Sequence, residues 1–266
     1  MQIDRLKGVR LKIDHAKKRL AELENAMEAF IKTTPCRISV RCDIGSRKVI
    51  YFVASVDRVP DEFSLLTGDV INNLRSALEH LAGQLVTVGT QGTVDTKHVY
   101  FPIAENRESY LKVRPKYTKG MDQPALDIID GLEPYGDGQG ADYYTLHKLN
   151  NLDKHSLLIA VGAMHTGVNI GAHFRAIMRK FWGARVDALP PIDFYAQPAG
   201  EVKPIQAGDE LFTDAPDADV VPDFGFQFGL TLQVPAPIKS EAPSTLLHRL
   251  VALTESTVTK LEKCLT

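Results

Sequence analysis

The sequence predicts an α+β protein in which long helices at the two ends pack together beside an antiparallel β-sheet. Apolar residues recur at heptad spacing at both ends, and apolar and polar residues alternate in internal stretches. Strands and helices do not alternate as a parallel sheet requires, so the strands are expected to be antiparallel. We assign a single domain, 1–266, with its helical part at about 1–33, 64–153 and 243–266 and its β part at about 36–57 and 156–236.

The composition is that of a folded globular protein. Of the 266 residues, 44% are hydrophobic and 24% are charged, which excludes a disordered or low-complexity chain. The formal net charge of −2 gives no global attraction to nucleic acid or to an anionic membrane, so any such contact must be local. The chain starts without an apolar signal core, and no stretch approaches the ~20 apolar residues of a membrane span. With three cysteines, which suit reduced thiols, we expect a cytoplasmic protein.

Helices are predicted over residues 3–31 and 244–265. In both, apolar side chains are spaced alternately by three and four residues, which is the seam of a helix that packs on another helix. The two helices pack most simply on each other, which brings the ends of the chain together. Dimerisation through one seam is the alternative. The seam residues are Leu6, Val9, Ile13, Ala16, Leu20, Leu23, Met27 and Phe30 at the start, and Leu247, Val251, Thr254, Val258, Leu261 and Leu265 at the end.

Between the end helices the period of the pattern changes. Residues 36–44 alternate apolar and polar side chains, and Gly45-Ser46 turns the chain into 48–56, which predicts a β-hairpin. Alternation also predicts strands at 168–178 and 224–234, and Leu157–Ile159 is strand-like. Helices are predicted at about 64–86, 122–132 and 141–153, residues 88–122 are predicted to be irregular, and residues 201–223, with seven acids against one lysine, are predicted to form an acidic connector.

The most informative segment is the helical stretch 72–82. The side opposite its apolar face contains Asn, Ser, Arg, Glu and His, and no lysine. An ordinary solvated helix face is rich in lysine and glutamate, so this composition predicts a second interface built from hydrogen bonds. The structural alternative is a buried polar contact in which Arg75 and Glu79 form a plain i,i+4 pair. The polar residues are Asn72, Asn73, Arg75, Ser76, Glu79 and His80.

Arg75, four intervening residues and His80 resemble the signature spacing of the HEPN superfamily, helical domains that include metal-independent ribonucleases. The resemblance covers this helix. It implies that His80 is a general acid or base at a ribose 2′-hydroxyl and that Arg75 stabilises charge on the phosphate, usually across a dimer interface. Imidazole titrates near neutrality and guanidinium matches phosphate geometry, so the residue types suit this chemistry. The catalytic candidates are therefore Arg75, His80 and Glu79.

A second polar segment, 147–155, ends a predicted helix. Its last residues could simply stabilise the helix C-terminus, or they could meet the polar face of the first segment and form a binding site. Together, Asn-Asn-Leu-Arg-Ser-Ala-Leu-Glu-His-Leu-Ala and Asn-Leu-Asp-Lys-His resemble a pairing in bacterial and phage-encoded proteins, which implies a fold relationship and no particular activity. The binding candidates are Asn72, Asn73, Asp153, Lys154 and His155.

We also predict how the two segments meet. Burying an unpaired charge costs several kcal/mol, so opposite charges brought into the interior should find each other. Arg75 is therefore expected to pair with Asp153. Either Glu79 or His80 is expected to lie within hydrogen-bonding reach of Lys154 or His155.

The sequence patterns for a metal site and for RNA-binding patches are weaker. Adjacent Glu79 and His80 point about 100° apart on a helix, so we assign no metal and no cofactor and keep a metal-dependent hydrolase as an alternative. Local basic patches are candidate RNA contacts, although solvated strand faces often carry such charges. The metal-type ligands are Glu79, His80, His147, Asp153 and His155; the patches are Arg37, Arg41, Arg47 and Lys48 on the hairpin, and His173, Arg175 and Arg179 on a predicted strand.

Two functional hypotheses follow from the sequence. The first is an RNA-directed hydrolytic module of defence or toxin type, acting as a HEPN-like endoribonuclease. The second is a non-catalytic binding or interaction protein, in which Arg75 and His80 form a structural polar network with Asp153 and His155. The expected partners are RNA or a second copy of the chain, and no membrane.

Overall fold

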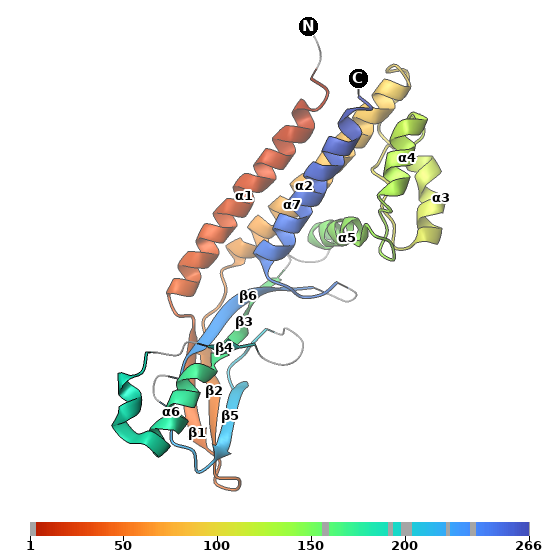
Figure 1. Cartoon of the computed structure of the whole chain (residues 1–266). Coiled ribbons are helices and arrows are strands. Elements are labelled where there is room, and N and C mark those ends of the chain that lie inside the picture. The colour runs from red at the N-terminus through yellow and green to blue at the C-terminus, as the bar shows by residue number, and fades with distance from the viewer. Residues whose placement is uncertain are drawn as a thin grey trace.

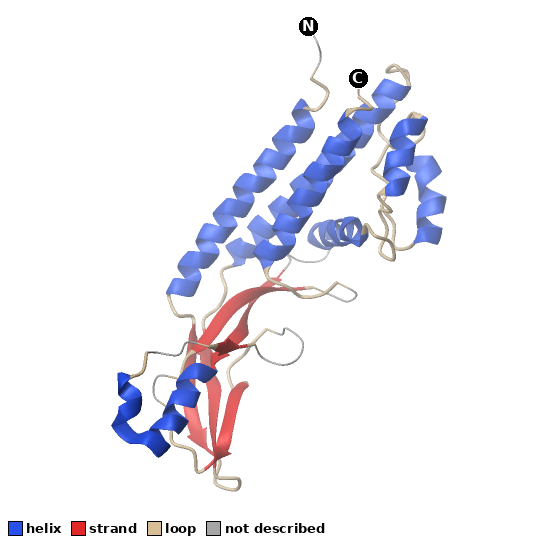
Figure 2. Ribbon diagram, viewed as in Figure 1, coloured by secondary structure: helices blue, strands red, loops and turns tan. Residues whose placement is uncertain are grey.

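The computed structural model describes residues 4–155, 160–190, 194–197, 204–221, 224–234 and 238–265. In these residues it confirms the α+β prediction, because helices form one end of an elongated molecule and two small antiparallel sheets lie toward the other (Figure 1; Figure 2). The strand-like Leu157–Ile159 lie outside the described residues. In chain order the elements are α1 (Lys7–Lys32), β1 (Cys36–Cys42), β2 (Lys48–Val56), α2 (Asp61–Gly89), α3 (Arg107–Tyr117), α4 (Gln123–Gly131), α5 (Ala141–His155), β3 (Ala160–Asn169), α6 (Ile170–Trp182), the short 3-10 helix η1 (Gly183–Ala188), β4 (Tyr195–Ala196), β5 (Glu210–Pro216), β6 (Phe226–Gln233) and α7 (Pro243–Glu262).

The two end helices, α1 and α7, lie side by side and antiparallel, which confirms their predicted packing (Figure 1). Ion pairs fix their direction. Arg10 near the start of α1 pairs with Glu262 at the end of α7 at 2.7 Å, and Lys17 pairs with Glu255 at 2.9 Å. The seam residues of both helices are mostly buried, and α2 packs against both helices. The seams are therefore occupied within the chain.

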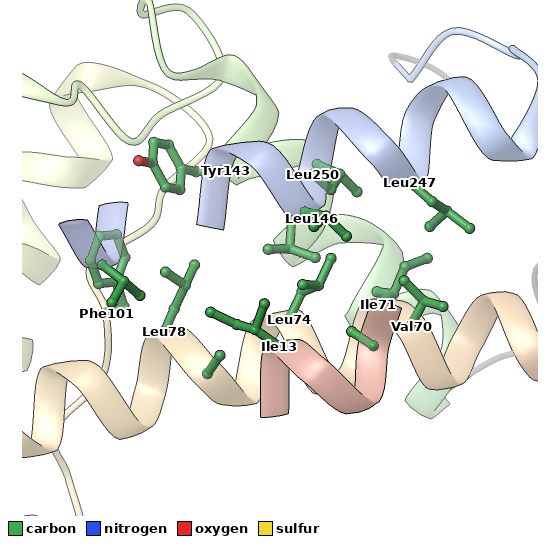
Figure 3. Close-up of a cluster of buried hydrophobic side chains, with 14 of the residues drawn as sticks. Ile13, Val70, Ile71, Leu74, Leu78, Phe101, Tyr143, Leu146, Leu247 and Leu250 are labelled. Atoms are coloured by element: carbon green, nitrogen blue, oxygen red, sulfur yellow. The ribbon is translucent and has the colours of Figure 1, made fainter. Parts of the chain in front are cut away.

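Helix α2 is at the centre of the helical core. It begins after Pro60, and Asp61 and Glu62 in its first turn complement the positive end of the helix dipole. Apolar side chains on several sides of α2 contact α1, α5 and α7, so α2 is enclosed by other helices over much of its length. Figure 3 shows this cluster, to which α2 contributes Val70, Ile71, Leu74 and Leu78 and its neighbours contribute Ile13, Leu146, Leu247 and Leu250.

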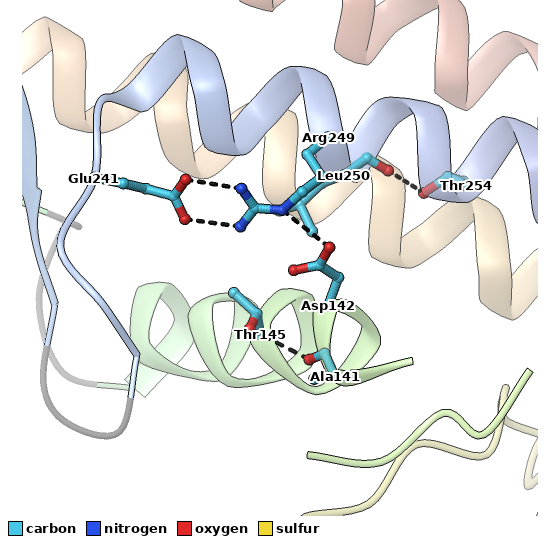
Figure 4. Close-up of polar contacts among 7 residues, drawn as sticks. All are labelled: Ala141, Asp142, Thr145, Glu241, Arg249, Leu250 and Thr254. Carbon is cyan, nitrogen blue, oxygen red and sulfur yellow. Dashed lines mark hydrogen bonds and ion pairs between the residues drawn. The ribbon is translucent and has the colours of Figure 1, made fainter. Parts of the chain in front are cut away.

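Arg249 of α7 holds the beginning of α5 in place. Its guanidinium donates two hydrogen bonds to Glu241 at 2.7 and 2.8 Å and one to Asp142 of α5 at 2.9 Å (Figure 4). The hydrogen bonds that it donates to Glu241 and then to Asp142, offset in part by desolvation, raise the pKa of this guanidinium. The cluster joins α5, α7 and the segment that precedes α7.

One helix lies where irregular chain was predicted. Residues 88–122 contain α3, whose N-cap residue Asn106 accepts a hydrogen bond from the backbone N–H of Ser109 at 2.9 Å. The prediction was wrong because α3 buries only Tyr110 and has Pro115 inside it, so no apolar periodicity marks the helix.

The first sheet has the strand order β1-β2-β5. The predicted hairpin is confirmed, since β1 and β2 pair antiparallel over the predicted ranges. The expectation of a mere connector at 201–223 was wrong, because β5 lies inside it and pairs with β2. Phe212 of β5 packs on Tyr51, with ring centroids 6.2 Å apart, while of the two acids in this edge strand Glu210 is exposed and Asp214 is buried.

The second sheet has the order β4-β3-β6. Here one predicted strand is confirmed and another is replaced by a helix. The strand predicted at 224–234 is confirmed as β6, but the one predicted at 168–178 is wrong, because the chain becomes α6 at Ile170. Apolar residues at 170, 174 and 178 fit both periods, since a spacing of four is a multiple of two and is also close to one helical turn. Ile177 and Phe181 break the alternation and complete a helical stripe.

Candidate functional site

A cavity of about 480 Å³ lies where α2, α3, α5 and the segment 100–105 meet. This volume falls within the range of small-molecule sites. In each helix the residues that face the cavity span about two turns, because positions i, i+3, i+4 and i+7 share a helix face. Its two polar walls consist of Asn72, Arg75, Ser76 and Glu79 from α2, and His147, Asn150, Asn151 and Lys154 from α5.

Arg75 and Glu79 connect α2 to the segment that closes the cavity. They form an ion pair one helical turn apart. Arg75 Nη2 also donates to the carbonyl oxygen of Phe101 at 3.2 Å, and the N–H of Phe101 donates to Glu79 Oε2 at 2.8 Å. The Phe101 ring is buried and stacks on Tyr143, with centroids 5.7 Å apart. Both backbone groups of Phe101 are thus held by side chains of α2.

Arg75 is buried and Glu79 is partly buried, and the charge of each partner compensates that of the other. Burial lowers the pKa of the Arg75 guanidinium, which the Glu79 carboxylate opposes. Burial raises the pKa of the Glu79 carboxyl, which Arg75 and the Phe101 N–H oppose. A buried charge without its partner is strongly destabilising, so this pair must be kept or lost together.

Polar atoms of the cavity wall lack hydrogen-bond partners. In the described part of the chain, three of the four buried side-chain atoms without a partner belong to residues that line this cavity. They are Arg75 Nη1, His147 Nδ1 and Asn150 Oδ1. Buried polar atoms are nearly always paired, so their gathering at one cavity is the strongest indication of a ligand site.

His147 is neutral near pH 7 and presents a hydrogen-bond donor. Burial, and then the charges of Arg75, Lys148 and Lys154, lower the pKa of His147 to about 4. Its Nε2 lies 3.0 Å from Asn151 Nδ2, which can only donate, so Nε2 accepts and the proton resides on Nδ1. Arg75 and Lys154 bring positive charge to the cavity wall, which the carboxylates of Glu79 and Glu105 also line.

Two tyrosines stand at the edge of the cavity. The rings of Tyr100 and Tyr117 are 5.2 Å apart and nearly perpendicular, and the Tyr100 N–H donates to the Tyr117 carbonyl at 3.3 Å. Tyr100 is 41% exposed, so an aromatic surface lies beside the polar walls. Sequence reasoning missed both residues, along with Ser109 and Glu105, because they lie in or beside the unrecognised helix α3. The Asn106 cap is the signal that could have revealed that helix.

The structure brings together only part of the predicted site. Arg75, Glu79 and Asn72 line the cavity together with Lys154; burial raises the pKa of Glu79, and the Lys154 charge is one of the contributions that oppose this. Within the described residues, the hydrogen bonds of Glu79 go to Arg75 and Phe101 rather than to Lys154. The two sequence segments therefore share a site, and the structural alternative for the Arg75–Glu79 pair is the one observed.

His80 and Asn73 lie on a different side of α2. The imidazole of His80 is exposed and faces the start of α1, where a Cβ on Gly8 would lie 3.4 Å from Nδ1. Asn73 accepts a hydrogen bond from Lys12 of α1 at 3.3 Å. Neither residue lines the cavity between α2, α3 and α5, which we call the Arg75 cavity.

The predicted Arg75–Asp153 pair was wrong. The carboxylate of Asp153 lies against Gly68, one to two turns before Arg75 on α2, and burial, with the charge of Asp69, raises its pKa. Arg75 is neutralised within its own helix instead, because the i+4 position already supplies an acid. The side chain of His155 lies outside the described residues.

The alternative metal site is not assembled in the described residues, which contain no group of three or more His, Cys, Asp or Glu side chains placed to hold a metal. Glu79 and His147 line the cavity, whereas His80 and Asp153 lie elsewhere. The cavity wall offers arginine, lysine and amide groups, which suit an anion, beside Glu105 and the Glu79 carboxylate that Arg75 and the Phe101 N–H already bind.

The predicted basic patches are partly neutralised by acids of the 201–223 segment. Arg41 pairs with Glu210 at 2.5 Å and Arg47 with Asp217 at 2.8 Å. The second patch lies on α6 rather than on a strand, and there His173 Nδ1 lies 3.3 Å from the buried Asp214.

Comparisons of the chain with family models, curated proteins and solved structures found no match. None of the described helices has both the length and the apolar character to cross a membrane. Inference of function therefore starts from the Arg75 cavity.

Proposed function

We propose that the Arg75 cavity binds a small anionic molecule and that the protein acts as a ligand-binding module. The observation that supports this proposal is that three buried atoms of the lining residues have no hydrogen-bond partner: Arg75 Nη1, His147 Nδ1 and Asn150 Oδ1. Leaving a buried polar atom unpaired costs about 1–3 kcal/mol. A ligand that pairs these atoms removes that cost, which favours the bound state.

The wall chemistry suits a ligand with an oxyanion next to a hydrogen-bond donor. A carboxylate or phosphate oxygen accepts from Arg75 and His147, and the Lys154 ammonium adds positive charge. Asn150 Oδ1 accepts from a hydroxyl or amine of the same molecule. The three unpaired atoms are themselves buried, so contact with a ligand requires side-chain rotations of the kind that accompany binding.

The test is isothermal titration calorimetry with inorganic phosphate, a 2-hydroxycarboxylate and a ribonucleoside monophosphate as probes. Lys154→Gln should weaken the best probe about fivefold, which corresponds to roughly 1 kcal/mol for one charge contact. Lys148→Gln is the matched control, because Lys148 lies on the same helix and does not line the cavity. Absence of binding by every probe, or an equal effect of both variants, would contradict the proposal.

The HEPN-like ribonuclease is a second candidate, favoured by the exposure of the His80 imidazole. Arg75 and His80 face different sides of α2 within one chain, so a shared phosphodiester would have to be reached across two copies. Wild type is expressed beside His80→Ala and His15→Ala, an exposed histidine of α1, and growth and total RNA are read. Cleavage lost only in His80→Ala supports a ribonuclease, whereas intact RNA in all cultures argues against one.

A further inference from the structure

Helix α6 turns its apolar side to solvent. Phe174, Phe181 and Trp182 are 57%, 79% and 59% exposed, and Ile177 is also exposed. These residues lie at i, i+3, i+7 and i+8 and therefore form one stripe along the helix. Contiguous exposed apolar surface of this kind marks an interaction site, because its hydration is unfavourable. The helix lies at the end of the molecule that carries the sheets, away from the helical bundle (Figure 1).

The other side of α6 attaches it to the sheets. His173 packs on Phe212 and Phe224, and its Nδ1 lies 3.3 Å from Asp214. At the start of the helix, Gly171 is buried and Ile170 packs against the same aromatic cluster. The attachment is thus made by His173 and the first turn, while the large aromatic side chains farther along the helix face outward. An ordinary surface helix turns its apolar stripe to the core instead.

Basic residues flank the exposed stripe on both sides. With about 100° per residue, Arg175 and Arg179 lie on one side of Phe174, and Lys180 lies on the other. Helix α6 contains no acidic residue. Arg179 pairs with Asp187 and Lys180 with Asp219, each at 2.9 Å, and exposed pairs of this kind are weak enough to exchange for another anion.

We infer that α6 docks on an anionic lipid surface, lying in the membrane plane with its aromatic stripe among the acyl chains. Phe and Trp on one face with Arg and Lys at its borders is the pattern of an interfacial helix. The charges complement lipid phosphates, whereas two α6 helices placed face to face would bring their cationic borders together. With 13 residues, α6 is too short to span a bilayer and must lie along it.

This inference is independent of the Arg75 cavity. The sequence led us to expect no membrane partner, because the net charge is −2 and no segment spans a membrane. Neither property bears on a peripheral helix, whose contact is local.

Trp182 is the one tryptophan of the chain, so its fluorescence reports on α6 alone. The full chain is mixed with vesicles of phosphatidylcholine, with or without phosphatidylglycerol, and emission and co-sedimentation are measured. We expect a blue shift and sedimentation with the anionic vesicles, both weakened by high salt. Phe181→Ala should reduce vesicle partitioning about tenfold.

Two controls separate the inference from its competitors. Leu111→Ala removes a side chain of similar exposure from α3 and should leave partitioning unchanged. Arg179→Gln combined with Lys180→Gln should lower binding to anionic vesicles while leaving the fold, followed by circular dichroism, intact. The inference is overturned if neither vesicle shifts the emission, or if the blue shift depends on protein concentration without vesicles, which would indicate a second copy.

Discussion

Arg75 and Glu79 hold the two backbone polar groups of the same residue, Phe101, while they also pair with each other. Arg75 bonds the Phe101 carbonyl at 3.2 Å and Glu79 accepts its N–H at 2.8 Å. A segment that lacks regular structure therefore has its backbone hydrogen bonds satisfied by a helix. The same guanidinium leaves its buried Nη1 unpaired, so one residue both fixes the wall and lines the candidate ligand site.

Replacing Arg75 by alanine should lower the free energy of unfolding by about 3–5 kcal/mol, because it strands a buried carboxylate. Equilibrium urea denaturation measures the loss. Arg75→Met combined with Glu79→Leu removes both charges, so it should be less destabilising than Arg75→Ala alone. An Arg75→Ala protein as stable as wild type would show that the pair does not support the fold.

Two glycines of α2 offer a test of where Asp153 lies. A Cβ on Gly68 would overlap the Asp153 carboxylate, whereas nothing lies within 4 Å of a Cβ on Gly83. Gly68→Ala should destabilise the protein by about 1–3 kcal/mol through overpacking. Gly83→Ala should stabilise it by up to about 1 kcal/mol through helix propensity. Thermal unfolding of both variants measures the difference.

Adding Asp153→Ala to Gly68→Ala should recover much of the lost stability, because the substitution removes the atoms that the new methyl group meets. If Gly68→Ala and Gly83→Ala prove equally stable, Asp153 does not pack against α2 at this position.

The elements that could be predicted from the sequence are those whose apolar residues follow a single period over many residues. The seams of α1 and α7 satisfy this condition, and so does the alternation in β1 and β6. In α6 the apolar residues fit two periods, and the face that packs on the protein carries few large side chains, so pattern alone chose the wrong element. In β5 the packing of the half-buried Phe212 on Tyr51 and the pairing with β2 form a strand although the surrounding composition is acidic.

The candidate site was half predictable for a similar reason. The unusual polar face of α2 singled out Arg75 and Glu79, and the end of α5 singled out Lys154, and all three line the cavity. Helix periodicity could not show that His80 turns toward α1, because the wheel gives angles but not neighbours. Tyr100 and Tyr117 lay in a stretch without a pattern.

Arg249→Lys should lower stability by about 1 kcal/mol, because lysine cannot reproduce the paired hydrogen bonds to Glu241 while also reaching Asp142. The matched control is Arg58→Lys. The Arg58 guanidinium binds Asp61 and is 82% exposed, so this substitution should leave the stability nearly unchanged. Urea denaturation of both variants tests the expectation. An equal loss in both would mean that the Glu241–Asp142 cluster contributes no more than a surface pair.

His147 should make the protein less stable in mild acid. Its pKa is lowered to about 4, whereas a histidine in an unfolded chain has a pKa of about 6.5. Between these values the unfolded chain binds a proton that the folded chain does not, so the free energy of unfolding falls as the pH drops from about 6.5 toward 4 and is unaffected by this group above that window. After allowance for partial exposure, the loss attributable to His147 should be on the order of 2 kcal/mol.

Urea denaturation across this range should give a shallower pH dependence for His147→Gln than for wild type, while His15→Gln, an exposed control on α1, should follow wild type. Parallel curves for wild type and His147→Gln would mean that His147 titrates in the folded protein as it does in the unfolded chain, and the neutral donor proposed for the cavity would then be lost at mildly acidic pH.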